Sequence, residues 1–293
     1  MKKFKILIPV YNDWKSVFKL LDKIDEEISI FDNEFSVIVV NDASTEKLEN
    51  TSFNYKNLKS VTVLNMKKNQ GHTRCNATGI KYLSEMSDFD FLIVMDGDGE
   101  DRPEDLRSLI NEVLSNKNIS FVAKRKKRSE GIVFTILYHL HKIITYVFTG
   151  KNMNFGHYSC LTREDVILLS TKKSLWSSYA GTTKKYIKKL NELPTIRGKR
   201  YFGISKIPII GLMIHSFSII AVFKYQVFAR STLFFLLSFL FFKQFTLFVI
   251  FFQTMLFIFV IIIFMTSRRE SLEALSNSPS QIGEILDIHT KRL

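Results

Sequence analysis

Residues 91–101 read Phe-Leu-Ile-Val-Met-Asp-Gly-Asp-Gly-Glu-Asp, and this segment decides the fold. Its apolar half is typical of a buried strand. The strand ends abruptly in carboxylates and glycines, and Pro103 then opens a stretch with apolar residues at helical spacing from Leu106 to Leu114. The sequence therefore places carboxylates at the carboxyl end of a buried strand, where open α/β sheets bind ligands.

The two carboxylates Asp96 and Asp98 lie two residues apart on a glycine-containing turn. Hard oxygen ligands on such a turn suit Mg²⁺ or Mn²⁺ carrying a substrate diphosphate. An EF-hand loop also begins with this spacing, but it needs Gly at its sixth position and Glu at its twelfth. Asp101 and Arg107 stand there, so that class of site is excluded. A solvated acidic turn without a metal remains the alternative.

Strands and helices alternate along the first hundred residues. Apolar runs at 5–10, 35–40, 61–64 and 89–95 predict four buried strands with helices between them. This alternation predicts an α/β fold with a mostly parallel, Rossmann-like sheet and right-handed crossovers. Polar residues follow the strands, among them Tyr11, Asn12, Asp42 and Asp96. We expect them to gather along one edge of the sheet.

Charge and missing motifs exclude several classes of protein. The net charge of +13 suits nucleic acid, anionic lipid or phosphorylated substrates as partners. The sequence has no zinc-finger spacing and no RNA-binding aromatic signature, so we exclude nucleic acid. The dinucleotide fingerprint and the Walker lysine loop are also missing, which argues against dehydrogenases and P-loop enzymes. Cys75 and Cys160 form no metal spacing and indicate a reducing compartment.

Four short motifs occur in an order that is specific to one protein family. They are Ile-Pro-Val-Tyr-Asn at 8–12, Val-Val-Asn-Asp-Ala-Ser at 39–44, Asn-Gln-Gly at 69–71 and Met-Asp-Gly-Asp at 95–98. Together they resemble the family-2 glycosyltransferases, which have the GT-A fold. The family often has Asp where this chain has Asn41.

That resemblance implies a role for each matching residue. The donor nucleotide would be held by Pro9, Tyr11, Asn12 and Asp42. It also implies that Asp96 contacts the ribose or the metal, and that Asp98 is the main ligand of Mg²⁺ or Mn²⁺.

A motif in the second half of the chain points to one subgroup of this family. Residues 197–206 read Arg-Gly-Lys-Arg-Tyr-Phe-Gly-Ile-Ser-Lys, similar to a segment of polyprenyl-phosphate glycosyltransferases, the dolichol-phosphate-mannose-synthase-like group. This resemblance spans about residues 4–267. It implies that phosphate groups of donor or acceptor are handled by Arg125, Arg128, Arg200, Ser205 and Lys206. Guanidinium forks match phosphate oxygens, which agrees with that role.

His157 departs from the group, which often carries Asp near this position. A histidine there could act as a base, but a lone histidine is more often structural, and we favour the structural interpretation.

The carboxyl-terminal third is strongly apolar. Residues 207–224 are typical of an interfacial segment. The runs 225–242 and 245–266 each have about the length that spans a bilayer, so the sequence predicts two transmembrane helices within 225–267. The alternative is a single span over 245–266, with the first run lying in the interface.

Charges set the predicted orientation of these spans. Arg230 belongs near the headgroups, and basic residues flank both outer ends of the apolar region. The positive-inside rule then places the glycosyltransferase domain, residues 1–206, and the tail, residues 268–293, in the cytoplasm. The helix expected at about 132–148 suits either a core or a membrane interface.

These observations together predict an integral inner-membrane enzyme. The resemblance implies that it transfers a sugar from a nucleotide sugar to undecaprenyl or dolichyl phosphate on the cytoplasmic face. The transfer would depend on a metal ion and invert the configuration of the sugar. Alternatives are transfer to a hydroxyl of a polysaccharide or lipid-linked sugar, and a non-catalytic membrane scaffold. A processive synthase is disfavoured because the Gln-x-x-Arg-Trp motif is absent. Assembly into a homo-oligomer is left open.

Overall fold

The structure, a computed structural model, describes residues 1–48, 54–116, 119–125, 132–203, 209–241 and 247–290. Within these residues the centre of the molecule is one eight-stranded sheet in the order β7-β5-β6-β4-β1-β2-β3-β8. The strands are β1 (Lys3–Val10), β2 (Glu34–Asn41), β3 (Leu58–Met66), β4 (Phe91–Val94), β5 (Ser120–Arg125), β6 (Phe155–Thr162), β7 (Leu190–Thr195) and β8 (Ile282–Thr290).

The sheet is mixed, so the expectation of a mostly parallel sheet holds in part: among the described residues four strand pairings are parallel, β5 with β7 included, and three are antiparallel. The four predicted strands pair in parallel, β4 with β1, β1 with β2 and β2 with β3. However, β6 runs antiparallel to both β4 and β5, and β8 runs antiparallel to β3. A residue pattern of apolar strands does not encode strand direction, and β6 inserts between two strands that precede it in the chain.

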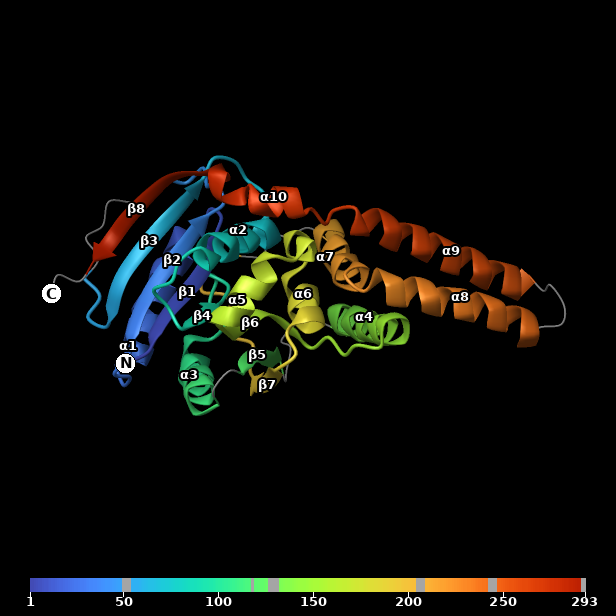
Figure 1. Ribbon diagram of the computed structural model, residues 1–293, viewed down its shortest axis with the longest axis horizontal. Coiled ribbons are helices and arrows are strands. Elements are labelled where there is room, and N and C mark those ends of the chain that lie inside the picture. The colour runs from blue at the N-terminus through green and yellow to red at the C-terminus, as the bar shows by residue number, and fades with distance from the viewer. Residues whose placement is uncertain (49–53, 117–118, 126–131, 204–208, 242–246, 291–293) are drawn as a thin grey trace.

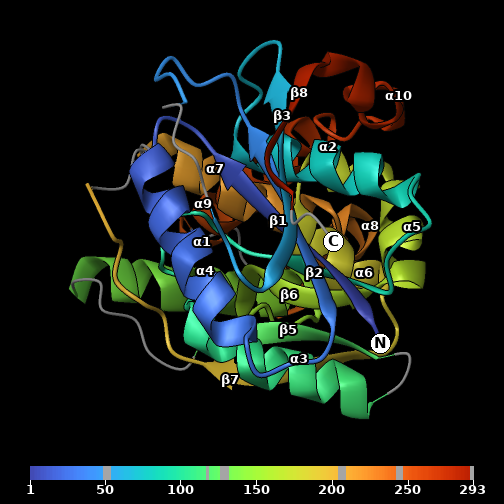
Figure 2. The same ribbon diagram turned by 90° about the vertical axis from the view of Figure 1, so that its left-hand side faces the viewer.

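Helices cover both faces of the sheet (Figure 2). One face packs against α1 (Trp14–Ile28) and α3 (Leu106–Ser115). The other packs against α2 (His72–Ser84), α5 (Arg163–Ser170), α6 (Tyr179–Tyr186) and the short 3-10 helix η2 (Lys173–Trp176). Successive residues of a strand point to opposite faces, so Ile6 and Ile8 belong to the first core and Leu7 to the second.

The apolar third folds into helices that extend away from the sheet. They are α7 (Ile209–Ala221), α8 (Lys224–Phe241) and α9 (Leu247–Ser267), with α4 (Ile132–Thr149) beside them. Figure 1 shows α8 and α9 side by side, pointing away from the sheet. In the described residues one helix, beginning at Leu247, is long and apolar enough to cross a membrane. The pair α7 and α8 qualifies only when taken together, and it is bent by 86°.

One span is therefore supported by length and composition, and the predicted hairpin stays a prediction. The predicted boundary between residues 206 and 207 falls within 204–208, outside the described residues.

The tail returns to the sheet after α9. Two short elements, α10 (Leu272–Ser276) and η3 (Ser278–Gln281), lead into β8, which pairs along the edge of β3. Leu275 is fully buried in the core that α2 covers. The strand β8 thus forms one edge of the sheet, as Figure 1 shows. The sequence had suggested no role for this tail.

Candidate active site

The polar residues predicted at one sheet edge do gather there, at the ends of β1, β2 and β4. Asp42 directly follows β2 and is only 2% exposed. Its two carboxylate oxygens accept the backbone N–H groups of Gln70 and Gly71, at 2.7 and 2.8 Å. Burial raises the pKa of Asp42, and these two hydrogen bonds partly offset the rise. The carboxylate therefore fixes the loop that precedes α2.

Asn12 ties together the loops after β1 and β2. Its side-chain oxygen accepts the backbone N–H groups of Thr45 and Glu46, and its own N–H donates to Ser44. Its φ of 50° is left-handed, a conformation that asparagine tolerates better than most residues. Of the predicted nucleotide-binding residues, Tyr11 is 43% exposed beside this loop, whereas Pro9 is buried within β1.

The acidic turn after β4 is closed by its own side chains. Asp98 accepts the backbone N–H of Glu100 at 2.9 Å, and the buried Asp101 accepts that of Asp96 at 3.0 Å. Gly99 has a φ of +86°, which an L side chain rarely adopts. These bonds fix the backbone of the turn and orient the carboxylate of Asp98 at the strand end.

Residues 197–201 dock directly onto this turn. Gly198 donates its N–H to the carbonyl of Glu100, and Tyr201 donates to that of Asp98. A Cβ at Gly198 would lie 2.6 Å from the carbonyl oxygen of Gly99, so only glycine permits this approach. Two segments about a hundred residues apart thereby form one surface.

Two arginines of the docked segment neutralise carboxylates of the turn. Arg200 donates to Asp98 at 2.7 Å and to Asp13 at 3.2 Å, while Arg197 pairs with Glu100. Burial raises the pKa of Asp98 to about 6, and the nearby Asp96 carboxylate adds to the rise. The structure therefore brings together Asp98 and Arg200, which the sequence had assigned to metal and phosphate binding.

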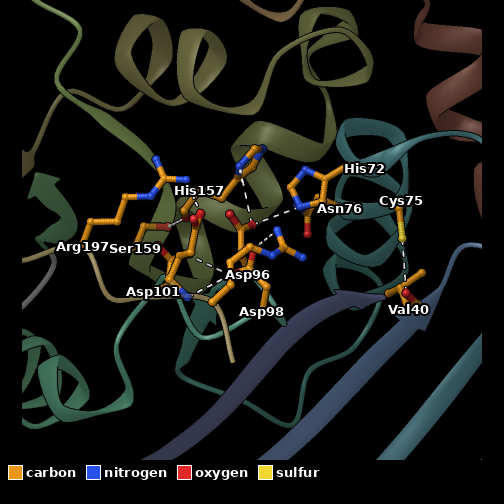
Figure 3. Close-up of polar contacts among 12 residues, drawn as sticks. Val40, His72, Cys75, Asn76, Asp96, Asp98, Asp101, His157, Ser159 and Arg197 are labelled. Atoms are coloured by element: carbon orange, nitrogen blue, oxygen red, sulfur yellow. Dashed lines mark hydrogen bonds and ion pairs between the residues drawn. The ribbon is translucent and has the colours of Figure 1, made fainter. Parts of the chain in front are cut away.

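Two histidines flank the other carboxylate of the turn. His72, the first residue of α2, lies with Nε2 at 3.0 Å from Asp96 Oδ1, and His157 of β6 lies with Nδ1 at 3.8 Å from the same atom. In Figure 3 dashed lines join Asp96 to both imidazoles. Burial lowers the pKa of His72, but the charge and hydrogen bond of Asp96 outweigh that effect, so its pKa is raised overall.

The donor atoms of His72, Asp96 and His157 all lie within 4.8 Å of one another, a grouping that could hold a metal ion. Two imidazoles and a carboxylate are suitable ligands for a divalent transition metal. The residues present therefore fit a divalent cation, and Asp96 is the one predicted ligand among them, whereas Asp98 is not part of this grouping.

Several predicted phosphate-binding residues fall outside the described part of the chain. Arg128, Ser205 and Lys206 are among these residues. The backbone of Arg125 ends β5, paired with Thr195, but its side chain is not described.

Sequence reasoning missed His72 and the pairing partner Arg197. A signal for His72 was present, because it directly follows the motif at 69–71 on the same sheet edge. A role for His72 in metal binding depends on His157, which is 85 positions away in the sequence and comes close to it only in the folded chain.

The family profile described as glycosyl transferase family 2 matches residues 5–179, more than half of the chain. The chain belongs to glycosyl transferase family 2. The matched residues contain the sheet edge, the acidic turn and both histidines. In this glycosyltransferase the carboxylates and histidines of the candidate site lie within the matched part, whereas the docked segment 197–201 follows it.

Curated relatives are distant in sequence. The undecaprenyl-phosphate 4-deoxy-4-formamido-L-arabinose transferase of Klebsiella pneumoniae is 22% identical over 215 residues, covering 70% of this chain and 63% of that protein. The protein of the same name from Erwinia tasmaniensis is 22% identical over 222 residues, with 73% and 65% covered. The chain thus aligns with just under two thirds of the length of these relatives.

Solved structures support the fold. Glucosyl-3-phosphoglycerate synthase from Mycobacterium tuberculosis, in complex with Mn²⁺, UDP-glucose and phosphoglyceric acid, matches with a TM-score of 0.52 and 14% identity. The match covers 77% of this chain and 80% of the synthase. The same synthase with Mn²⁺, UDP and phosphoglyceric acid gives a TM-score of 0.53. The catalytic half therefore has the fold of a GT-A glycosyltransferase.

Proposed function

We propose that this glycosyltransferase moves a sugar from a nucleotide sugar to a polyprenyl phosphate at the cytoplasmic face of a membrane. The observation that carries the proposal is the docking of Arg200 onto Asp98 and Asp13. It puts a guanidinium at the acidic turn where, in this family fold, a sugar diphosphate would lie. The names of the two curated relatives support undecaprenyl phosphate as the acceptor class.

The arginine can exchange partners. A guanidinium presents several N–H donors in a planar fork, and phosphate oxygens match that fork as well as a carboxylate does. A cleft of about 530 Å³ opens beside Arg200 and Asp13 and offers room for a ligand. On donor or acceptor binding, Arg200 would turn from Asp98 to a phosphate, so the carboxylate becomes available at the same moment.

Asp96 and Asp98 are the proposed carboxylate ligands of a divalent cation. Such an ion, when bound, would offset the charge that develops on the nucleoside diphosphate as it leaves. The hydrogen bond from the N–H of Glu100 orients the carboxylate of Asp98, and the bond from the N–H of Asp96 to Asp101 fixes the backbone of the turn.

The acceptor chemistry needs no general base. A phosphate monoester has a second pKa near 6 and is largely dianionic at neutral pH. Attack by one of its oxygens on the anomeric carbon, from the face opposite the diphosphate, forms the new C–O bond as the old one breaks and inverts the configuration. The electron pair of the broken bond leaves with the nucleoside diphosphate.

A second candidate is transfer to a hydroxyl of a polysaccharide or lipid-linked sugar. One observation favours it: the imidazole of His157 faces Asp96 at 3.8 Å, an arrangement that could orient a base. A hydroxyl nucleophile has to lose its proton in the reaction, so this acceptor would make His157 indispensable.

The apolar helices support the membrane location. Leu247, Phe248 and Phe251 of α9 are 88%, 67% and 62% exposed. An exposed apolar surface of this kind suits lipid contact. We therefore place the acceptor phosphate at the membrane surface on the side of the catalytic half.

The test is a panel of nucleotide sugars offered to the purified full-length protein with either polyprenyl phosphate or a hydroxyl-bearing lipid-linked sugar. Mass analysis of the lipid product identifies the acceptor. Asp98→Ala serves as the inactive control and Arg107→Ala, which breaks only a peripheral pair with Glu27, as the active one. A product only with the hydroxyl acceptor, together with loss of activity in His157→Ala, would support the second candidate instead.

A further inference from the structure

The two histidines beside Asp96 come from separate parts of the fold. His72 begins α2, Asp96 follows β4, and His157 lies within β6. The imidazole rings of His72 and His157 stand edge to face with centroids 4.6 Å apart. Sequence spacing gives no sign of this cluster, because the three residues meet only when the sheet forms.

Each ring is held in place by its surroundings. His157 is 5% exposed and stacks on the fully buried ring of Tyr179, with centroids 5.4 Å apart. His72 is fixed by its position at the start of α2, directly after Gly71, whose N–H is bound by Asp42. The cluster is therefore built before any ligand arrives, which reduces the cost of ordering it.

The distances suit one small cation. Ligand atoms at about 2.1 Å from a metal lie roughly 3 to 3.4 Å apart in tetrahedral or octahedral coordination. The pair His72 Nε2 and Asp96 Oδ1 already has this separation at 3.0 Å, and the 3.8 Å to His157 Nδ1 needs only a small adjustment.

The other carboxylate of the turn is engaged differently. Both oxygens of Asp98 have partners, since Oδ1 accepts from Glu100 and Oδ2 from Arg200. Before the donor binds, Arg200 therefore competes with a metal ion for the carboxylate of Asp98.

We infer that, before donor binding, this chain holds a first-row transition-metal dication through His72, Asp96 and His157, in preference to Mg²⁺. Imidazole nitrogen favours transition metals, whereas Mg²⁺ prefers oxygen ligands. Three protein ligands leave further positions open, as in catalytic metal sites, so a diphosphate oxygen can complete the shell. The inference deepens the proposed function, but the metal site itself can be tested without any sugar transfer.

The experiment titrates the metal-free full-length protein with Co²⁺, using its visible absorption as the signal for nitrogen coordination, and follows the binding heat. Wild type should give a one-to-one complex that about a hundredfold excess of Mg²⁺ fails to displace. His72→Ala and His157→Ala should each weaken Co²⁺ binding at least about tenfold, since even an outer-shell change commonly costs that much.

Two controls keep the result interpretable. His139→Ala removes an exposed histidine of α4 and should bind Co²⁺ as wild type does. Asp98→Asn should also keep its Co²⁺ affinity, although it loses transfer, so metal binding and the proposed function are distinguished. Thermal unfolding of the metal-free variants checks folding. If the buried His157 variant is unstable, the partly exposed His72 decides the question.

Unchanged Co²⁺ affinity in folded His72→Ala would overturn the inference. So would a site that Asp98→Asn abolishes while His72→Ala leaves it intact, or a wild-type protein that prefers Mg²⁺.

Discussion

At the scale of single residues, the acidic turn forms ion pairs with arginine. Arg200 is shared by Asp98 and Asp13, and its guanidinium is about four-fifths shielded from solvent. Charge-assisted hydrogen bonds of this kind are about twice as strong as neutral ones. The geometry of the fork therefore matters as much as its charge.

This geometry leads to a prediction for Arg200. Arg200→Ala should lower transfer roughly ten- to a hundredfold, because removing one charged hydrogen bond costs about 1.5 to 3 kcal/mol. Arg200→Lys should recover only part of the loss, since an ammonium cannot bridge two acceptors in one plane. Initial rates with a fixed donor and acceptor measure both, with Arg107→Lys as the control for a peripheral arginine. Full activity in Arg200→Ala would show that no phosphate depends on this residue.

The candidate site was predictable in part at this scale. The carboxylates Asp96 and Asp98 could be identified because they directly follow a strongly apolar strand. Arg200 could be identified only through its resemblance to a family segment. The pairing of Asp98 with Arg200 and the approach of His72 to Asp96 could not, because both depend on contacts between distant segments.

At the scale of elements, local sequence patterns predicted where strands lie but not which strands pair with one another. The first three strands lie within two or three residues of their expected bounds. In contrast, β8 was missed, although Leu286 and Ile288 alternate with polar residues as in a half-buried strand. Its partner β3 precedes it by more than 200 residues, and sequence alone gives no sign of so distant a pairing.

The short helix α10 provides a test of how firmly the tail is attached. Leu275 is fully buried against the core that α2 covers, whereas Leu272, three residues earlier, is 48% exposed. Leu275→Ala should lower the free energy of unfolding by about 2 to 5 kcal/mol, as for a buried leucine elsewhere. Leu272→Ala should change it by less than about 0.5 kcal/mol. Thermal midpoints of both variants in the same detergent give the comparison, and equal midpoints would mean that the tail contributes no stability.

The edge strand β7 gives a prediction about pH. Glu192 contacts Lys124 at 3.0 Å, Lys184 at 3.2 Å and Asn154 at 3.0 Å. Burial raises the pKa of Glu192, but the hydrogen bonds and charges of these partners outweigh that effect and lower it below the usual 4.5. Ionised Glu192 therefore stabilises the fold above pH 4.5, and this contribution disappears as the pH falls through the lowered pKa.

Glu192→Gln should accordingly lower the free energy of unfolding at pH 7 by about 1 kcal/mol, and the thermal midpoint should fall with it. The difference from wild type should shrink as the pH falls below 4.5. Glu85→Gln, which breaks one exposed pair with Lys81, is the matched control and should have little effect at either pH. A Glu192→Gln defect that persists undiminished at low pH would point to lost packing instead of lost charge.

At the scale of the whole molecule, the helices α8 and α9 are joined to each other at one end of the pair. The ammonium of Lys224, at the start of α8, lies 2.9 Å from the carboxylate of Glu270, just after α9. Glu270 is almost fully buried in this pair. Figure 1 shows both helices extending from this point in the same direction. The fold thus keeps the two outer ends together, whichever helices enter the bilayer.

This fastening leads to the last prediction, which concerns topology. If α9 crosses the membrane, the ends joined by Lys224 and Glu270 must share one side, and the residues between α8 and α9 must reach the other. Single cysteines replacing Tyr225 and Leu272, which are 71% and 48% exposed, should resist an impermeant thiol reagent added to intact cells and react after lysis. A cysteine replacing Gln244, which lies outside the described residues, should react from outside. The native Cys75 and Cys160 are buried and give little background. Labelling of positions 225 and 272 from opposite sides would exclude the hairpin, and protection of position 244 would show that this turn does not cross the membrane.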